Sequence, residues 1–446
     1  MGERAPEPLM RNAIIAGLLS ALAFAAYWPL DHVTKVLNQN DNFWYVPTAM
    51  SLLDEGNFDL NEFERPITEL AEDVTYLKSY YGEEHYRLMR RDDGRVFNTY
   101  SVMTSIAAAP FVAVLKPVFR KQPNAIWVSI HMSLIIAKIY AAASVGLLFL
   151  VAFRLSKSVC IALILALILA FASLNAGQHA GGYWSHNPGT FFVLLGLAAL
   201  LMLPGRWAGL SGAALAIAAS MRPDVIVLIA LLTLYVLLHQ RKAFLVYALS
   251  GAALALVYVL ICKATYGEWI QPYPGPTQVL GRDFDSGIFG LLVSPSRGLF
   301  IYMPVCLLSL WGMVRCFRDR SDTFVVYRFL ALAVLGHWIF LALWPMWWGG
   351  WSYGPRLFCT YIPIWLLLTI PFWQTWHAVP RLRRIPLNVA IMVCIAWSAF
   401  VEYRGVTDHD VHLWNGMPND VNDHIDRFWD WSDMQIMRGL GGTYGA

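Results

Sequence analysis

The sequence predicts an all-α membrane protein with about eleven transmembrane helices, and its composition and its apolar runs carry that prediction. Of the 446 residues, 57% are apolar and 14% are charged, whereas soluble globular proteins carry about 25% charged residues. Apolar runs close to the roughly 20 residues that a helix needs to cross the hydrocarbon core recur along the whole chain. These features exclude a soluble domain with one anchor, and nucleic acid is not expected among the partners.

Eleven apolar runs are predicted to span the membrane. They cover residues 12–29, 127–153, 158–178, 184–203, 207–220, 223–239, 243–262, 298–317, 324–344, 357–372 and 387–402. The first run lacks a small-residue cleavage site, so we expect it to be retained rather than removed as a signal peptide. No Asn-x-Ser/Thr acceptor occurs, which favours a bacterial inner membrane. The six cysteines lie in or beside apolar runs without metal or redox spacing and are interpreted as small core residues.

The connections between these runs alternate in character, and this alternation sets the orientation. One set is short and basic, with Arg or Lys at positions 4 and 11, 154 and 157, 206, 241–242, 315–320 and 381–384. Such loops stay in the cytoplasm under the positive-inside rule. The other set is long or rich in aromatic residues, at 30–126, 179–183, 221–222, 263–297, 345–356 and after Tyr403. We expect these stretches to face outside and the N-terminus to be cytoplasmic.

Residues 1–403 are predicted to form one transmembrane domain, and residues 404–446 an outer tail. Two large outer loops interrupt the domain, at 30–126 and 263–297. Within the first loop, residues 101–119 are apolar enough to cross the membrane, but they contain a central proline and end in basic residues. We interpret this segment as a juxtamembrane or re-entrant helix on the outer face. The alternative is a twelfth span, which would move every later basic loop to the outer side.

Away from their ends, the predicted spans are nearly free of charged residues. Lys138 and His337 are the exceptions, interpreted as a snorkelling or paired lysine and as a core histidine. A channel or transporter would place polar residues at mid-depth in several spans, and no internal repeat suggests transporter halves. The functional site is therefore expected among the long outer loops.

Several stretches carry a resemblance to a known family. They are "NDNFWYVPTAMSLLDEGNFDL" (40–60), "NTYSVMTSIAAAPFVAVL" (98–115), "YGEWIQPYPG" (266–275), "GIFGLLVSPSRGLFIYMPVCLLSLWG" (287–312) and "WWGGWSYGPRLFCTYIPIWLLL" (347–368). Their order along the chain, and their shared placement on the predicted outer side, resemble GT-C membrane glycosyltransferases. The closest likeness is to bacterial enzymes of the aminoarabinose-transferase and protein-mannosyltransferase type.

The resemblance implies a GT-C fold with juxtamembrane helices in the first outer loop. It also implies an inverting transfer of a sugar from a polyprenyl-phosphate-linked donor to a hydroxyl of a glycan, lipid or protein acceptor in the periplasm. Such a reaction needs a carboxylate to take the acceptor proton. It also needs cationic donors around the departing lipid phosphate.

Asp41 matches the acidic residue with which the first outer loop of that family opens, so it is the candidate general base. The alternative role for Asp41 is the N-cap of the helix predicted to follow it. Asp31 is the nearest rival, but it borders the first span and is interpreted as a helix-end residue. The dipeptide Asp41-Asn42 lacks a second acid, so no required cofactor is expected, and a divalent metal is the less favoured alternative. The cluster "DHDVH" (408–412) is interpreted as a polar surface, with a metal site as the alternative.

Four basic residues are candidates for binding the donor phosphate: Arg356, Arg297, Arg222 and Lys78. The three arginines fall at predicted outer ends of spans, where a guanidinium can grip phosphate through two donors. The alternative for each is interface snorkelling. Four further residues are candidates for substrate binding: His186, Tyr45, Trp348 and Tyr353. For these the alternatives are an interface hydrogen bond and an aromatic belt at the membrane surface.

Two other function classes remain open from the sequence. One is a transporter or flippase of a lipid-linked saccharide, and the other is a catalytically inactive factor in envelope polysaccharide assembly. A flippase requires charged or broken-helix sites within the spans.

Overall fold

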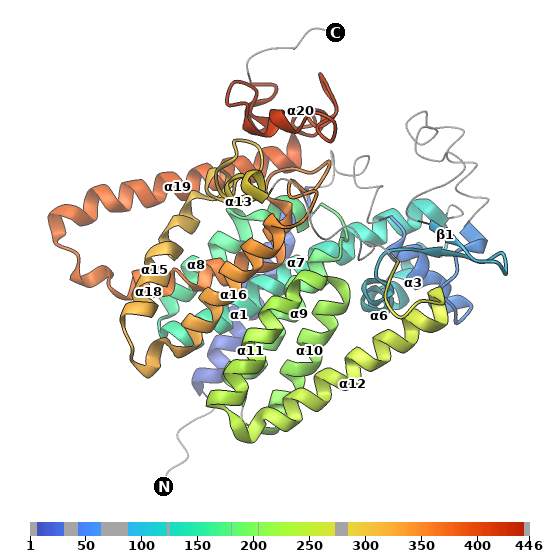
Figure 1. Cartoon of the computed structure of the whole chain (residues 1–446), viewed down its shortest axis with the longest axis horizontal. Coiled ribbons are helices and arrows are strands. Elements are labelled where there is room, and N and C mark those ends of the chain that lie inside the picture. The colour runs from blue at the N-terminus through green and yellow to red at the C-terminus, as the bar shows by residue number, and fades with distance from the viewer. Residues whose placement is uncertain are drawn as a thin grey trace.

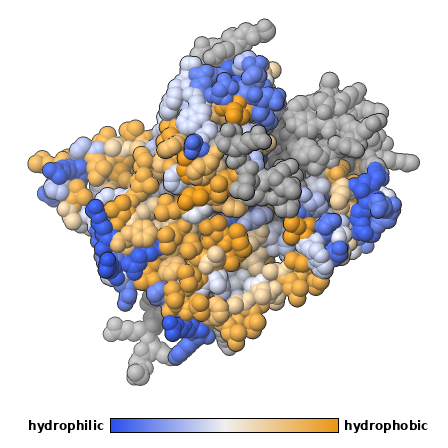
Figure 2. Space-filling view, in the orientation of Figure 1, coloured by the Kyte–Doolittle hydropathy of each residue, from blue (hydrophilic) through white to orange (hydrophobic). Residues whose placement is uncertain are grey.

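The computed structural model describes residues 7–30, 43–63, 88–122, 125–179, 181–203, 205–272 and 284–440. Over these residues the structure is helical apart from one short hairpin, so the all-α prediction is confirmed. Seven helices are long and apolar enough to cross a membrane, and five shorter apolar helices accompany them. Hydrophobic residues cover much of the surface of the helix bundle (Figure 2). These features fit a multi-pass membrane protein.

The elements have the following bounds. The bundle contains α1 (Glu7–Tyr27), α7 (Ala125–Ser156), α8 (Val159–Phe171), α9 (His186–Met202), α10 (Ala208–Met221), α11 (Ile226–His239), α12 (Arg241–Tyr266), α14 (Leu299–Tyr302), α15 (Leu307–Arg318), α16 (Val325–Ala342), α17 (Ile362–Leu367), α18 (Ile370–Gln374) and α19 (Arg381–Thr407). The predicted outer stretches contain α3 (Tyr45–Asp54), strands β1 (Leu88–Arg90) and β2 (Val96–Asn98), α6 (Val102–Phe119), α13 (Phe284–Val293) and α20 (Asp410–Leu413). Short turns of 3-10 helix include η4 (Pro223–Val225), η6 (Pro304–Cys306) and η8 (Arg356–Tyr361).

Prolines break two of the predicted spans. The run 298–317 is divided into α14 and α15 at Pro304, and the run 357–372 is divided into η8, α17 and α18 near Pro363 and Pro371. Proline fixes φ and has no backbone N–H, so it is tolerated in the first turn of a helix and disfavoured farther along. Each of these prolines accordingly lies in the first turn of its element.

The centre of the bundle is α7, which packs against α1, α8 and α9. Small residues allow close approach between neighbours. A Cβ added to Gly146 of α7 would lie 2.8 Å from the carbonyl oxygen of Ala16 in α1. One added to Gly212 of α10 would collide with the carbonyl of Tyr247 in α12. Close contact of this kind holds transmembrane helices together where lipid removes the hydrophobic driving force.

The described part of the predicted first outer loop packs as a separate layer against one end of the bundle. Figure 1 shows α3, α6 and β1 together on one side, with α6 seen nearly along its axis while α9, α10 and α11 run lengthwise. Lys116 of α6 pairs with Asp54 of α3, and both helices contribute to a second apolar cluster. This course is the one expected of a juxtamembrane helix. Since α6 also has the length and apolarity of a span, its location stays a prediction.

The tail forms a cap of short helical turns. Helix α19 runs to Thr407, so the tail starts a few residues later than predicted. Its buried apolar side chains are Val411, Trp414, Val421, Phe428 and Ile436. In Figure 1 the cap lies at one end of the molecule, beyond α13. A Ser294 hydroxyl just after α13 donates to the carbonyl oxygen of Phe428, which ties the cap to the bundle.

Candidate functional site

A cavity of about 170 Å³ opens at the end of the bundle that carries the first outer loop. Its walls come from distant parts of the chain: Tyr45, Tyr100–Ser101, Trp184–His186, Met221–Asp224, Gln271, Phe340–Leu341, Trp344, Met346, Gly349 and Arg356–Leu357. Five of the six stretches predicted to face outside contribute residues to this cavity or lie directly beside ones that do. The charge pattern of the loops and the fold therefore agree on which loops share one end of the molecule.

Arg222 lies on the cavity wall at the junction of α10 and η4. Helix α10 ends here because Pro223 disfavours helical backbone at the preceding residue. The Arg222 Nε atom is 2.9 Å from Oδ1 of Asp224, although its N–H is not aimed at that oxygen. The missing side chain of Gly189 leaves room for the Arg222 stem, since a Cβ there would lie 3.2 Å from Arg222 Cγ.

His186 begins α9 and contacts Arg222 across the cavity wall. Nη1 of Arg222 lies 3.4 Å from Nε2 of His186. Arginine can only donate, so Nε2 of His186 is the acceptor in this contact. In this arrangement His186 supports Arg222 rather than donating from Nε2 to a ligand.

Arg356 begins η8 and follows a tight glycine-rich turn. Gly349, Gly350 and Gly354 have φ of +75°, +67° and +62°, a region that residues with a Cβ rarely adopt. The turn places Nη2 of Arg356 2.7 Å from the carbonyl oxygen of Gly349. Its guanidinium lies 5.3 Å from the centre of the Trp184 ring. The glycines that suggested a tight loop in the sequence thus hold an arginine at the cavity.

Tyr45 also lines the cavity, at the first residue of α3. Its ring meets the rings of Tyr100 and Tyr183 edge-on, with centroids 6.2 and 6.1 Å away. The N-cap position of α3 is Trp44, whose side chain makes no capping hydrogen bond. The alternative role of Asp41, as a cap of this helix, stays a prediction. Asp31, Asp41 and Lys78 themselves lie outside the described residues.

Arg297 does not line the cavity, and its surroundings favour a structural role over the predicted phosphate binding. It is fully buried between α13 and α14, beneath the cap. Its guanidinium donates to the carbonyl oxygens of Trp348, Ser296 and Gly350 and to side-chain oxygens of Gln435 and Asn415, at 2.6–3.2 Å. Because all three nitrogens are taken up, Arg297 is an anchor for the cap.

Trp348 and Tyr353 are likewise part of this anchored region rather than of the cavity wall. The Trp348 ring stacks on Phe428, and its Nε1 donates to Asn422 at 3.0 Å. The Tyr353 hydroxyl donates to the carbonyl oxygen of Val401 at 2.7 Å and is buried. These contacts favour a packing role for both residues, between the late loop and the tail, over the predicted substrate contacts.

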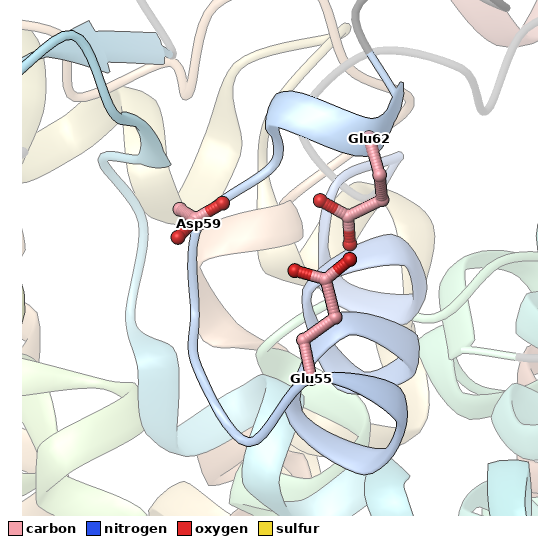
Figure 3. Close-up of side chains that lie close together, drawn as sticks. All are labelled: Glu55, Asp59 and Glu62. Carbon is pink, nitrogen blue, oxygen red and sulfur yellow. The ribbon is translucent and has the colours of Figure 1, made fainter.

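Three acidic side chains near the end of α3 could hold a metal by distance alone. Figure 3 shows Glu55 and Glu62 pointing toward each other, with Asp59 beside them, and their nearest oxygens all lie within 4.8 Å. Partial desolvation of its carboxyl group raises the pKa of Glu62, with the negative charges of Glu55 and Asp59 adding to the effect. Glu55 and Glu62 are exposed, as acidic groups without an ion commonly are. In the predicted "DHDVH" cluster, Asp408 pairs with Arg404, and His412 contacts the Gly405 carbonyl oxygen.

Sequence reasoning missed Asp224 and its link to His337. Asp224 lines the cavity, and its Oδ2 lies 3.0 Å from Nε2 of His337. The signal was available, since His337 is a polar residue in an otherwise apolar run and Asp224 follows Arg222 by two positions. Their proximity depends on the packing of α11 against α16, which no local pattern encodes. No protein-family model matches the chain and no curated protein sequence is similar to it, so the function has to be argued from these residues.

Proposed function

We propose that this protein is an inverting GT-C glycosyltransferase of the bacterial inner membrane. It moves a sugar from a polyprenyl-phosphate-linked donor to an acceptor hydroxyl on the periplasmic side. The observation that carries the proposal is the cavity in which Arg222 and Arg356 meet aromatic residues from the predicted outer loops. Asp41 is the general base in this proposal, on the strength of the family resemblance.

The two arginines suit the chemistry of the leaving group. A lipid phosphate gains negative charge as the glycosidic bond breaks, and guanidinium donors stabilise that charge more strongly than neutral donors do. The aromatic residues Tyr45, Trp184 and Trp344 on the same cavity wall suit the apolar faces of a sugar ring. Phosphate contacts and sugar contacts would thus lie side by side, as a bound lipid-linked sugar requires.

The proposal includes eleven membrane spans. Six are long apolar helices: α1, α7, α12, α16, the broken segment Arg356–Gln374 and α19. Shorter helices provide the other five: α8, α9, α10, α11 with η4, and α15 with α14 and η6. With α6 at the surface, this arrangement keeps every basic loop on one side, in agreement with the positive-inside rule.

The test is sugar transfer by the purified full chain in liposomes that contain a polyprenyl-phosphate-linked sugar. We expect release of polyprenyl phosphate by the wild type. The Asp41→Asn variant should lose at least about 100-fold in rate, because a general base typically contributes 10²–10⁴-fold. Arg356→Gln should also lose activity. The control Arg320→Gln, which is exposed in a predicted cytoplasmic loop, should not.

Other results assign the protein to the competing classes. Undiminished transfer by Asp41→Asn removes Asp41 as the base. Movement of labelled lipid across the bilayer without turnover of any donor supports the flippase. Absence of both turnover and movement supports the inactive assembly factor.

A further inference from the structure

A chain of polar contacts leads from the cavity wall into the bundle core, through Arg222, Asp224, His337 and Tyr361. Arg222 and Asp224 line the cavity, whereas His337 is fully buried behind them. Polar groups are costly to bury, so a buried histidine in an apolar helix needs a structural or functional reason.

Asp224 is held from two directions. Nε2–H of His337 donates to its Oδ2 at 3.0 Å. The hydroxyl of Tyr361 donates to its backbone carbonyl oxygen at 3.2 Å and accepts from the backbone N–H of Leu228 at 3.1 Å. The rings of His337 and Tyr361 stack, with centroids 3.6 Å apart and planes 6° apart. The carboxylate therefore has one fixed position beside the cavity.

His337 is bonded as a neutral imidazole. Its Nδ1 finds no hydrogen-bond partner among the described residues. A second proton on that atom would leave a buried N–H donor unsatisfied, which costs more than an unused lone pair on the neutral ring. The pair of Arg222 and Asp224 thus carries the charges, and His337 contributes orientation.

Two contacts hold the Arg222 guanidinium. Its Nε forms an ion pair with Oδ1 of Asp224 at 2.9 Å, without a directed hydrogen bond, and Nη1 contacts His186 at 3.4 Å. Its Nη2 makes no hydrogen bond within the described residues. The side chain is 17% exposed, so it is in reach of a ligand in the cavity. An arginine that is already oriented loses less rotamer entropy when it binds a phosphate.

We infer that Asp224 and His337 are positioning residues that hold the Arg222 guanidinium for the donor phosphate. They act through Arg222, since His337 does not line the cavity. The inference rests on the proposed function in one respect, that the anion in the cavity is a lipid phosphate.

The test compares two replacements of His337 that differ in one hydrogen bond. His337→Phe keeps the stacking ring and loses the donor to Asp224. His337→Gln can place an amide N–H near the position of Nε2. The measured quantities are the dissociation constant of polyprenyl phosphate for the full chain in lipid nanodiscs, and the KM and kcat for a polyprenyl-phosphate-linked sugar.

We expect His337→Phe to weaken binding and raise KM by about tenfold, the scale of one charge-assisted hydrogen bond. His337→Gln should remain within about twofold of the wild type. In an Arg222→Gln background, His337→Phe should add less than about twofold, because residues that act through one group are not additive. Thermal unfolding of each variant serves as the stability control.

Equal binding by His337→Phe and the wild type overturns the inference. So does a loss of affinity on His337→Phe that is as large in the Arg222→Gln background as in the wild type. If His337→Phe does not fold, Asp224→Glu takes its place. That variant keeps the charge and displaces the carboxylate, so binding should weaken, and unchanged binding contradicts a positioning role. Failure of the wild type to bind polyprenyl phosphate overturns the proposed function itself, and this inference with it.

Discussion

Arg297 is a buried charge whose surroundings explain how the protein tolerates it. Five oxygens accept its N–H groups, and its guanidinium lies 4.8 Å from the centre of the Phe428 ring. Burial lowers the pKa of Arg297 to about 9, so the group remains positive near neutral pH. Removal of a buried charge leaves its partners unsatisfied, which makes this site sensitive to substitution.

The Arg297→Gln variant should lose about 3–5 kcal/mol of stability, the usual cost of breaking a buried charged network. Thermal unfolding in detergent and limited proteolysis of the tail measure this loss. The exposed Arg320→Gln serves as the control and should be unaffected. If the Arg297→Gln variant has normal stability but binds phosphate weakly, Arg297 is a ligand contact after all.

His412 gives the cap a dependence on pH. Burial lowers its pKa below the ordinary value of 6.5, and Nε2–H donates to the Gly405 carbonyl oxygen at 2.7 Å. The unfolded tail therefore takes up a proton at a higher pH than the folded tail does. Stability of the cap rises with pH through this window and falls as the pH drops below about 6.5.

Proteolysis of the tail should accordingly be faster at about pH 5.5 than at about pH 7.5, on the two sides of the ordinary histidine pKa. The His412→Gln variant can keep the donor to Gly405 but cannot titrate. Its proteolysis should show a smaller change over the same range. An unchanged pH dependence in this variant would assign the effect to another group.

Among the elements, α6 determines on which side of the membrane each later loop lies. A helix at the surface leaves both of its ends outside, whereas a spanning helix places them on opposite sides. Asp92 precedes α6 and Arg120 directly follows it, and both side chains are exposed. These two positions report on the two arrangements.

Single cysteines at Asp92 and Arg120 should both react with a membrane-impermeant thiol reagent added from outside. A cysteine at Arg320, in a predicted cytoplasmic loop, should react only after the membrane is permeabilised. Reaction at only one of the two outer positions would make α6 a twelfth span.

Local patterns predicted much of the helix content, because apolar runs and proline breaks act over a few residues. The pairing of Arg222 with Asp224 is also local, because the two residues are two positions apart in the sequence. The partners of Arg297 could not be found in this way. Gln435 and Asn415 lie more than 100 positions after Arg297 in the sequence. They reach Arg297 only because the tail folds back onto the bundle. Three predicted site residues, Arg297, Trp348 and Tyr353, therefore pack in the region beneath the cap and do not line the cavity.

For the whole molecule, the central observation is that loops assigned to one side by charge meet in one cavity. Arg222, Arg356, His186 and Tyr45 come from separate elements and share its walls. The predicted spans carry few charged residues away from their ends, which favours this end of the bundle as the place for polar chemistry. The proposed function therefore requires that a lipid phosphate binds in this cavity.

The most direct measurement is an experimental structure of the full chain with polyprenyl phosphate bound. The account predicts the phosphate in the cavity, in contact with the guanidinium groups of Arg222 and Arg356, with Asp41 facing the space for the acceptor. A phosphate bound elsewhere on the protein, with these two arginines uninvolved, would contradict it.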